Sequence, residues 1–365
     1  MSQKLLKDID GLLFSIGGEW LLSKAINPLS NEDLQSIEIK VATILHGAAS
    51  KVGDEELAAF ISMVMESKSP EDLLANPKIT KVVEKAFGTI ALSMSSKDWK
   101  KVQKDLKNVY IRTKQLWSEK LKIVSSFTLQ DEGAIEYLHE NSQFWFKNTF
   151  LSKDKQALVV EKMRAIGEDA KASGLGRKEL AQNIEDKLGH YFNPDYPYWN
   201  VQASSMLVRA RTVSTLRSFS EAGCTTYRWI AMGDERTCPI CGSLDGQEWS
   251  VSTALKHVEK EMSLKDPEDL KYSSPWVYPE MKNNEFTGKG LIYKKSTEKI
   301  QKANMEVVEL ESTSLSDIGV NCPPIHGNCR CVLVASKFSK AFPQEKMLVS
   351  QDNIYKHKGH TPRVF

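Results

Sequence analysis

Two short blocks of cysteine and histidine residues, far apart in the sequence, constrain the fold of this 365-residue chain most strongly. The first block holds Cys238 and Cys241, with a proline and an isoleucine between them. The second holds His326 and Cys329 with the same spacing. Three thiolates and one imidazole in such pairs are typical of a closed, tetrahedral structural zinc site. The sequence therefore predicts that both blocks meet at one point, with residues 242–325 inserted between them.

Two further cysteines leave the ligand set open. Cys331 competes with Cys329 or His326, and Cys322 is a weaker competitor. We expect the metal to staple together two strands across the insertion, a closure that contributes roughly several kcal/mol to folding. The predicted ligands are Cys238, Cys241, His326, Cys329 and Cys331.

Other roles for the first cysteine pair receive less support from the sequence. A redox pair belongs at the start of a helix after a strand, whereas the glycine after Cys241 favours a tight knuckle. A catalytic zinc would keep one position open for water, with Glu235 or Asp245 as the base. The extra thiolates and the lack of a His-Glu-x-x-His motif favour a closed site instead. A disulfide would need an oxidising compartment.

The helical pattern of apolar residues ends near Gly223. Residues 225–231 are β-branched and aromatic and predict a strand, and residues 331–334 predict a second one. Between them the pattern predicts a helix at 251–262 and a loop rich in Pro, Asn and Gly at 273–290, and leaves 305–310 unassigned. Residues 223–335 are thus expected to form a small zinc-stapled α+β domain with few strands.

The preceding two thirds of the chain predict helices, because apolar residues recur there every three or four positions. We divide this part into a helical N-terminal region, 1–128, and a helical arm, 129–222. Segment 98–126 reads as an exposed amphipathic helix with Val124 on its apolar stripe, and the aromatic run 144–146 as core. The arginines at 209, 211 and 217 read as a solvated face. The expected fold class is α+β.

Composition narrows the choice of partners and compartment. A formal net charge of +2 argues against a dedicated nucleic-acid coat protein or a polybasic membrane binder. Six cysteines are too sparse for a disulfide scaffold, and residues 11–26 read as a buried helix or loop rather than a secretory leader, so we expect reduced thiols. No apolar run is long enough to cross a bilayer, and no membrane partner is expected. Residues 336–365 form a basic tail.

Four motifs follow one another between residues 180 and 331. They are Leu180-Ala181-x-x-Ile184, Arg209-Ala210-Arg211-Thr212, Gly-Asp-Glu-Arg-Thr-Cys-Pro-x-Cys-x-x-Leu-Asp-Gly at 233–246, and Pro-Pro-x-His-x-x-Cys-Arg-Cys at 323–331. In this order they resemble the Mu F-like minor head proteins of tailed bacteriophages, also called phage head morphogenesis proteins. The resemblance covers about residues 130–335, and the two cysteine blocks are its specific part. Cys322 and the long insertion depart from the family pattern, and the first 130 residues fall outside the match.

The resemblance implies a minor capsid component that associates with the portal protein and the procapsid interior. It also implies an influence on head assembly or on DNA packaging and ejection, a location inside the virion after assembly in the host cytoplasm, and no enzymatic activity. Scaffold or major capsid protein and packaged DNA are further implied partners. Asp245 and Arg330 are expected to hold the two halves of the metal site together.

Two alternatives belong to other functional classes. A toxin or enzyme built on the same module would need an additional catalytic domain, and residues 332–365 are too few to form one. A zinc-dependent DNA-binding protein would rely on the basic tail and on the lysines between Lys97 and Lys122.

Overall fold

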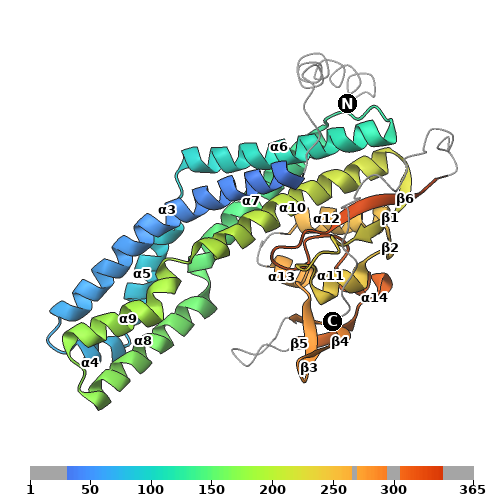
Figure 1. The fold of residues 1–365 in the computed structure, drawn as a ribbon. Helices are drawn as coiled ribbons and strands as arrows, with labels where there is room; N and C mark the ends of the chain where they lie inside the picture. The colour runs from blue at the N-terminus through green and yellow to red at the C-terminus, as the bar shows by residue number, and fades with distance from the viewer. Residues whose placement is uncertain (1–30, 265–268, 294–304, 340–365) are drawn as a thin grey trace. The chain divides into compact units, whose positions relative to one another are not determined.

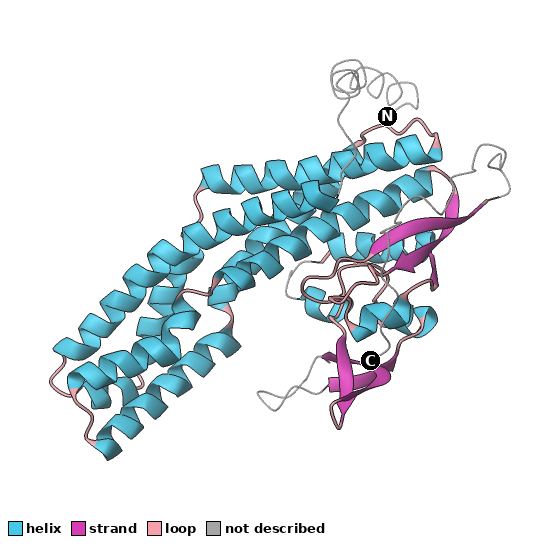
Figure 2. Ribbon diagram, viewed as in Figure 1, coloured by secondary structure: helices cyan, strands magenta, loops and turns pink. Residues whose placement is uncertain are grey.

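The computed structural model describes residues 31–264, 269–293 and 305–339 (Figure 1). These residues form an α+β structure, mostly helical at first and then containing two small antiparallel sheets of three strands each, which confirms the predicted fold class (Figure 2). The segment at 11–26 and tail residues 340–365 lie outside the described residues.

The helices of the first part follow the apolar periodicity of the sequence. One long helix contains both the apolar repeat of 31–48 and that of 57–64. The helix predicted at 98–126 ends at Leu121 and leaves Val124 92% exposed. The helices are α3 (Asn31–Glu66), α4 (Pro70–Ala75), α5 (Ile79–Ala91), α6 (Ser96–Leu121), α7 (Leu129–Leu151), α8 (Lys153–Ser173), α9 (Arg177–Phe192) and α10 (Tyr196–Glu221).

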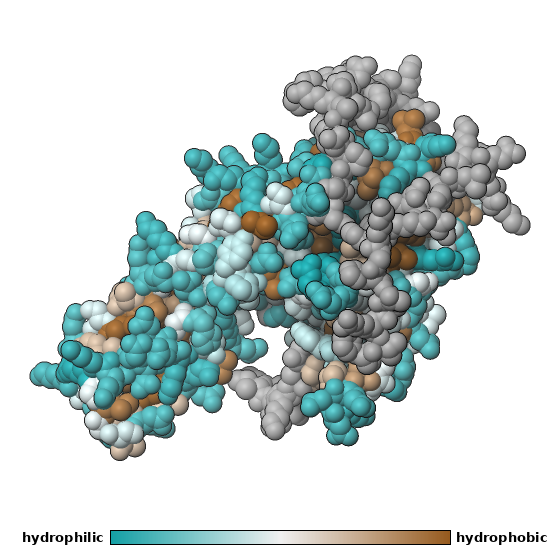
Figure 3. Space-filling model, viewed as in Figure 1, coloured by the Kyte–Doolittle hydropathy of each residue, from teal (hydrophilic) through white to brown (hydrophobic). Residues whose placement is uncertain are grey.

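The second part alternates strands with short helices. Its elements are β1 (Cys224–Ile230), α11 (Pro239–Leu244), β2 (Glu248–Ser250), α12 (Val251–Met262), α13 (Leu270–Ser273), β3 (Tyr278–Lys282), β4 (Glu285–Tyr293), β5 (Met305–Glu309), α14 (Ser312–Asp317) and β6 (Val332–Phe338). No helix in the described ranges combines the length and hydrophobicity needed to cross a membrane. Hydrophilic residues cover much of the visible surface of the helical segments, with smaller apolar patches between them (Figure 3).

The chain divides into two compact units, and each unit combines segments that are distant in the sequence. The helical unit comprises Gln35–Asp105 and His139–Ala203. Of the described residues, the sheet unit comprises 31–34, Leu106–Leu138 and 204–339 without the gaps at 265–268 and 294–304. The regions expected from sequence were consecutive, because local periodicity does not report which helices pack together.

Aromatic rings form the core of the helical unit. The Phe87 ring lies 5.1 Å from Phe192 and 6.2 Å from Phe150, measured between centroids. Phe146 lies 5.2 Å from Trp199, and all five side chains are buried. The prediction of core packing for the run 144–146 is confirmed for Phe146, while its two neighbours are half-buried. Such contacts contribute stability beyond the burial of area alone.

Close packing of α3 against the end of α9 depends on a glycine. A Cβ atom at Gly53 would lie 2.3 Å from the carbonyl oxygen of Phe192, a distance that requires backbone movement. Gly47 lies in the same helix, and a Cβ atom there would have nothing within 4 Å. The two glycines therefore differ in packing while sharing the same helical context.

We expect Gly53→Ala and Gly47→Ala to change stability in opposite directions. The first should lower the free energy of unfolding by about 2 kcal/mol because it overpacks the contact between α3 and α9. The second should raise it by about 0.5 kcal/mol because alanine restricts the unfolded chain and favours the helix. Urea unfolding of both variants checks this, and equal effects would contradict the packing argument.

The first sheet of the sheet unit has the strand order β2-β1-β6. β1 pairs antiparallel with both neighbours, and its register places Thr226 opposite Ser250 and Ile230 opposite Val332. The predicted strands at 225–231 and 331–334 are confirmed, as is the helix at 251–262. β6 continues beyond residue 335, where the α+β domain was expected to end, because the strand pairs with β1 as far as Phe338.

The second sheet has the order β3-β4-β5, and its first two strands correct the sequence analysis. The loop predicted at 273–290 is wrong, because β3 and β4 form a hairpin there. Asn283 and Asn284 connect the strands at φ of 53° and 64°, the left-handed conformation that a two-residue hairpin turn requires and asparagine tolerates. The unassigned segment at 305–310 contains β5.

A buried ion pair joins α10 to α12, and it also corrects a prediction. Arg209 donates to the carboxylate of Glu261, which is 2% exposed, so this arginine does not lie on a solvated face. Arg211 donates to the carbonyl of Cys331 at 3.1 Å, and Arg217 donates to Gln130 at 3.1 Å. Sequence periodicity missed the ion pair because its partners are far apart along the chain.

Acid should remove the stability that Glu261 contributes. Burial alone would raise the pKa of this carboxyl, but the charge of Arg209 and a hydrogen bond with His257 lower it from 4.5 to about 2. A lowered folded-state pKa stabilises the fold above the unfolded-state value, and this stability is lost as the pH falls from 4.5 towards 2.

The variant Glu261→Gln should therefore lower the free energy of unfolding at pH 7 by about 3 kcal/mol, because it leaves Arg209 buried without a counter-charge. The difference from the unmodified protein should shrink as the pH falls from 4.5 towards 2, because the carboxyl of Glu261 protonates in the unfolded chain before it does so in the folded one. Urea unfolding at a series of pH values measures both the loss of stability at pH 7 and its change with pH. Glu259→Gln, on the exposed face of α12, is the control. A difference that stays constant with pH would contradict the assignment.

Candidate metal centre

The pairing of β1 with β6 brings the two cysteine and histidine blocks to the same end of one sheet. Ile230, the last residue of β1, lies opposite Val332, the first residue of β6. Because the strands are antiparallel, the segment leaving β1 and the segment entering β6 are adjacent at this end. The first segment leads to Cys238 and Cys241, and the second contains His326, Cys329 and Cys331.

The first cysteine pair lies at the start of a helix. Cys238 is the N-cap of α11, and its Sγ accepts a hydrogen bond from the backbone N–H of Cys241 at 3.3 Å. Pro239 follows at the first helical position, where a missing N–H has no cost. We expected a helix start only for a redox pair, so this part of the prediction is wrong. One helical turn brings both sulfurs to the same side just as a knuckle does.

A tight turn positions the second pair. The N–H of Cys329 donates to the carbonyl of His326 at 3.4 Å, so the two ligands are the outer residues of a four-residue turn. Asn328 has a φ of 59°, the left-handed conformation that such a turn can require at its third position. The turn therefore aims the imidazole and the thiol towards the same point.

The five predicted ligands form two overlapping triads that share Cys241. Within each triad, the ligand atoms lie within 4.8 Å of one another. The Nε2 atom of His326 is 3.0 Å from the Sγ atoms of both Cys238 and Cys241. The Sγ atom of Cys241 is 4.0 Å from that of Cys329. One triad is Cys238, Cys241 and His326, and the other is Cys241, Cys329 and Cys331.

A backbone carbonyl orients the histidine. The Nδ1 atom of His326 lies 2.7 Å from the carbonyl oxygen of Gly327. A carbonyl can only accept a hydrogen bond, so Nδ1 carries a proton and Nε2 is the nitrogen that faces the thiols. This arrangement is usual for metal-binding histidines, in which the second ring nitrogen donates to a carbonyl or carboxylate.

The electrostatics favour thiolates at two of the cysteines. A hydrogen bond with Cys241 lowers the pKa of Cys238 to about 4, against the opposing effect of burial, and the bond with His326 adds to the shift. Hydrogen bonds with Cys241 and Cys331 also lower the pKa of Cys329. The thiolate is the form of cysteine that binds metals.

A surface ion pair links the two halves, but its partner differs from the expected one. Arg330 donates to both carboxylate oxygens of Asp234 at 2.6 and 2.5 Å. Asp245, predicted as a partner of the site, instead accepts a hydrogen bond from the N–H of Ala231 at 2.9 Å. The carboxylate of Asp234 is also held within its own loop, because its Oδ1 accepts a hydrogen bond from the backbone N–H of Arg236.

The remaining cysteines do not join the cluster. Cys322 belongs to neither triad, and burial raises the pKa of its thiol to about 12. Cys224 lies at the start of β1, where burial raises its thiol pKa to about 11. All six cysteines carry free thiols. The competition that the sequence left open is thus reduced to Cys329 and Cys331.

The donor set and its surroundings fit a small, soft metal ion. Four sulfurs and one imidazole nitrogen converge, no carboxylate of the described residues joins them, and Cys241, Cys329 and Cys331 are buried. The cavity beside Cys238 and His326 has a volume of about 10 Å³, which is the room for about one water molecule. The cluster is therefore compatible with a metal site.

Comparison of the chain with protein-family models gives no match, and comparisons with curated proteins and with solved structures give none either.

Replacing the shared ligand should abolish metal binding. We expect Cys241→Ser to remove the metal, because this thiol belongs to both triads, and to lower the melting temperature of the metal-loaded protein. Elemental analysis of reduced protein and thermal unfolding measure the two effects. Cys322→Ser, a nearby thiol outside both triads, should leave the metal content unchanged. Loss of metal in neither variant or in both would contradict the proposed ligands.

Proposed function

We propose that this chain is a minor head protein of a tailed bacteriophage, and that a structural zinc ion joins the two distant halves of its C-terminal domain. One observation carries the proposal. Cys238 and Cys241 meet His326 at 3.0 Å, so the two motif blocks that resemble the Mu F-like family come together in space. This meeting supports the pairing of the two blocks that are the specific part of the resemblance.

Zinc suits the donor set best. Thiolates and neutral imidazoles are its usual ligands in structural sites, and four ligands complete its tetrahedral shell. We assign Cys238, Cys241 and His326 as three of them. Cys329 is the fourth in this proposal, because its sulfur contacts that of Cys241 at 4.0 Å, close to the separation expected around one tetrahedral ion. Cys331 then remains as a thiol next to the site.

Several features support a structural role for the ion over a catalytic one. The cavity beside the ligands is too small for a substrate. Asp245, considered as a base, accepts a backbone hydrogen bond, and Glu235 is exposed on the adjoining turn. The five donors, four thiols and one imidazole, outnumber the four positions of a tetrahedral ion, so an open position for water has no support in the donor set. The proposed protein is therefore an assembly component and not an enzyme.

In this proposal the protein associates with the portal protein and lies inside the capsid, having been assembled in the host cytoplasm. The zinc centre holds the end of the β1–β6 pair rigid, and the helices offer exposed faces for contacts with the portal or with scaffold and capsid proteins. Packaged DNA is a further partner of the basic segments. These roles rest on the motif resemblance, which the joining of its two blocks supports.

Quantitative mass spectrometry of sedimented particles tests the proposal. Peptides of this chain should be present at a few copies per head, alongside the portal protein and far below the major capsid protein. Particles carrying Cys241→Ser should lose the protein or assemble poorly, while Cys322→Ser should have no effect. Finding the chain only in the soluble lysate, with particles free of it, would overturn the proposal.

A further inference from the structure

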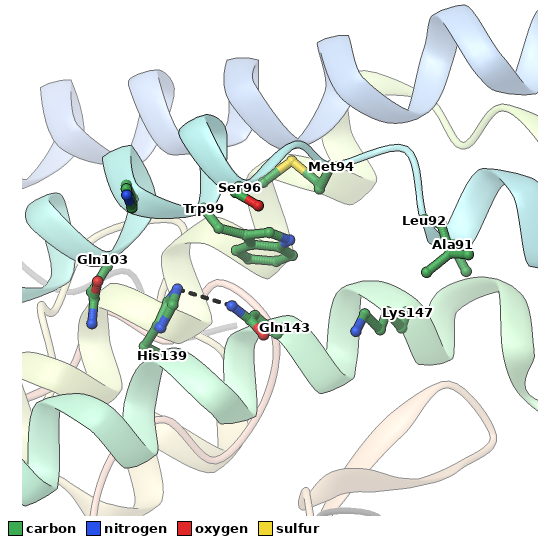
Figure 4. A pocket seen from close by; sticks show the side chains of 10 residues that line it. Ala91, Leu92, Met94, Ser96, Trp99, Gln103, His139, Gln143 and Lys147 are labelled. Atoms are coloured by element: carbon green, nitrogen blue, oxygen red, sulfur yellow. Dashed lines mark hydrogen bonds between the residues drawn. The ribbon is translucent and has the colours of Figure 1, made fainter.

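A pocket of about 390 Å³ lies within the helical unit, apart from the metal centre (Figure 4). It is formed at the junction of α5 with α6 and by the facing part of α7. Its volume is in the range of small-molecule sites, roughly 300–1,000 Å³. The lining residues are Ala91, Leu92, Met94, Ser96, Trp99, Lys100, Gln103, His139, Gln143 and Lys147.

The pocket is positively charged. Lys100 from α6 and Lys147 from α7 line it, and neither has an ion-pair partner among the described residues. The described residues of the lining include no aspartate or glutamate. Asp98 on the same turn of α6 is occupied, because it accepts hydrogen bonds from Lys101 at 2.8 Å and from Ser95 at 2.7 Å. Two lysines from different helices thus line one cavity, and no counter-charge accompanies them among the described lining residues.

Trp99 adds an unused hydrogen-bond donor. Its side chain is 8% exposed and is held edge-on by His139 and Phe146, with ring centroids 6.0 and 5.5 Å away. Within the described ranges, its indole N–H has no hydrogen-bond acceptor. In Figure 4 the indole nitrogen is on the side of the ring towards Leu92 and Ala91, at the cavity. This donor is therefore available to a ligand in the cavity.

The other walls combine polar and apolar groups. The Gln143 amide N–H₂ donates to Nε2 of His139 at 3.2 Å, which fixes both side chains at the pocket wall (Figure 4). Met94 and Leu92 supply an apolar surface, and Leu92 is 73% exposed. A ligand that satisfies all of these groups has a negative charge at one end and an apolar body at the other.

We propose that this pocket binds an organic phosphate of mononucleotide size. The phosphate accepts from Lys100, Lys147 and the Trp99 indole N–H, which together supply the charge-assisted donors that such an anion requires. The flat body of the ligand lies against Met94 and Leu92. This site lies beyond the proposed head function and does not depend on the metal centre, so either can fail alone.

The same chemistry has two sources: a free mononucleotide and one nucleotide of a single strand. The exposed lysines Lys97 and Lys104 lie on α6 on either side of Lys100, where they could contact neighbouring phosphates of a strand. With either ligand, the phosphate and the apolar part of one nucleotide occupy the pocket. Titration with both kinds of ligand distinguishes the sources.

Isothermal titration calorimetry of the full chain in phosphate-free buffer tests the site. The probes are AMP, inorganic phosphate, adenosine and a short single-stranded oligodeoxythymidylate. AMP should bind at least about tenfold more tightly than phosphate or adenosine alone. Lys147→Met and Lys100→Met should each weaken AMP binding about tenfold, the usual effect of losing one charge-assisted hydrogen bond. Trp99→Phe, which keeps a ring but removes the donor, should weaken it severalfold.

Lys104→Met is the matched control, because this exposed lysine on the same helix does not line the pocket, and it should leave AMP binding unchanged. Tighter binding of the oligonucleotide, lost with the same two lysines, would support the site and assign its ligand to a strand. Tighter binding of AMP would assign it to a free nucleotide. No saturable AMP binding at millimolar concentration, binding that survives both lysine substitutions, or equal affinity for adenosine would overturn the proposal.

Discussion

The antiparallel pairing of β1 with β6 is the constraint on which the candidate metal centre depends. It places Ile230 opposite Val332 and so joins segments that are separated by residues 231–331 in the sequence. Everything inserted between the strands, including α12 and the second sheet, must leave and return at this end. The cost in chain entropy of closing so long a loop is met by the strand pairing and, when bound, by a metal ion.

The surroundings of the cluster make it a rigid element of the sheet unit. Arg330 of the second block donates two hydrogen bonds to Asp234, which precedes the first block. Arg211 of α10 donates a hydrogen bond to the carbonyl of Cys331. The carbonyl of Gly327 fixes the imidazole of His326. These contacts orient the ligands before any ion binds, so the entropy lost on metal binding is reduced. The helical unit supplies a separate chemistry, in which unpaired lysines and an indole surround an open pocket.

The sequence predicted the features that depend on local pattern. The helix α12, the strands β1 and β6 and the two spaced pairs of candidate ligands all follow from periodicity or spacing within a few residues. It did not predict which distant charges meet, so Asp245 was assigned a role that belongs to Asp234. The hairpin turn at Asn283 was missed because two successive asparagines were taken as a loop signal, although they also suit a turn at positive φ. The Trp99 pocket has no local signature, since its residues come from three helices.

X-ray absorption spectroscopy at the zinc edge of the purified, reduced protein is the most direct test of the central claim that one ion joins the two cysteine and histidine blocks. The account predicts three sulfur neighbours at about 2.3 Å and one nitrogen neighbour at about 2.0 Å. Because Cys322 lies outside both triads, the second block alone offers only two sulfurs, and these donors require ligands from both blocks. A shell made of oxygen and nitrogen, one with two sulfurs or fewer, or protein that binds no zinc would contradict it.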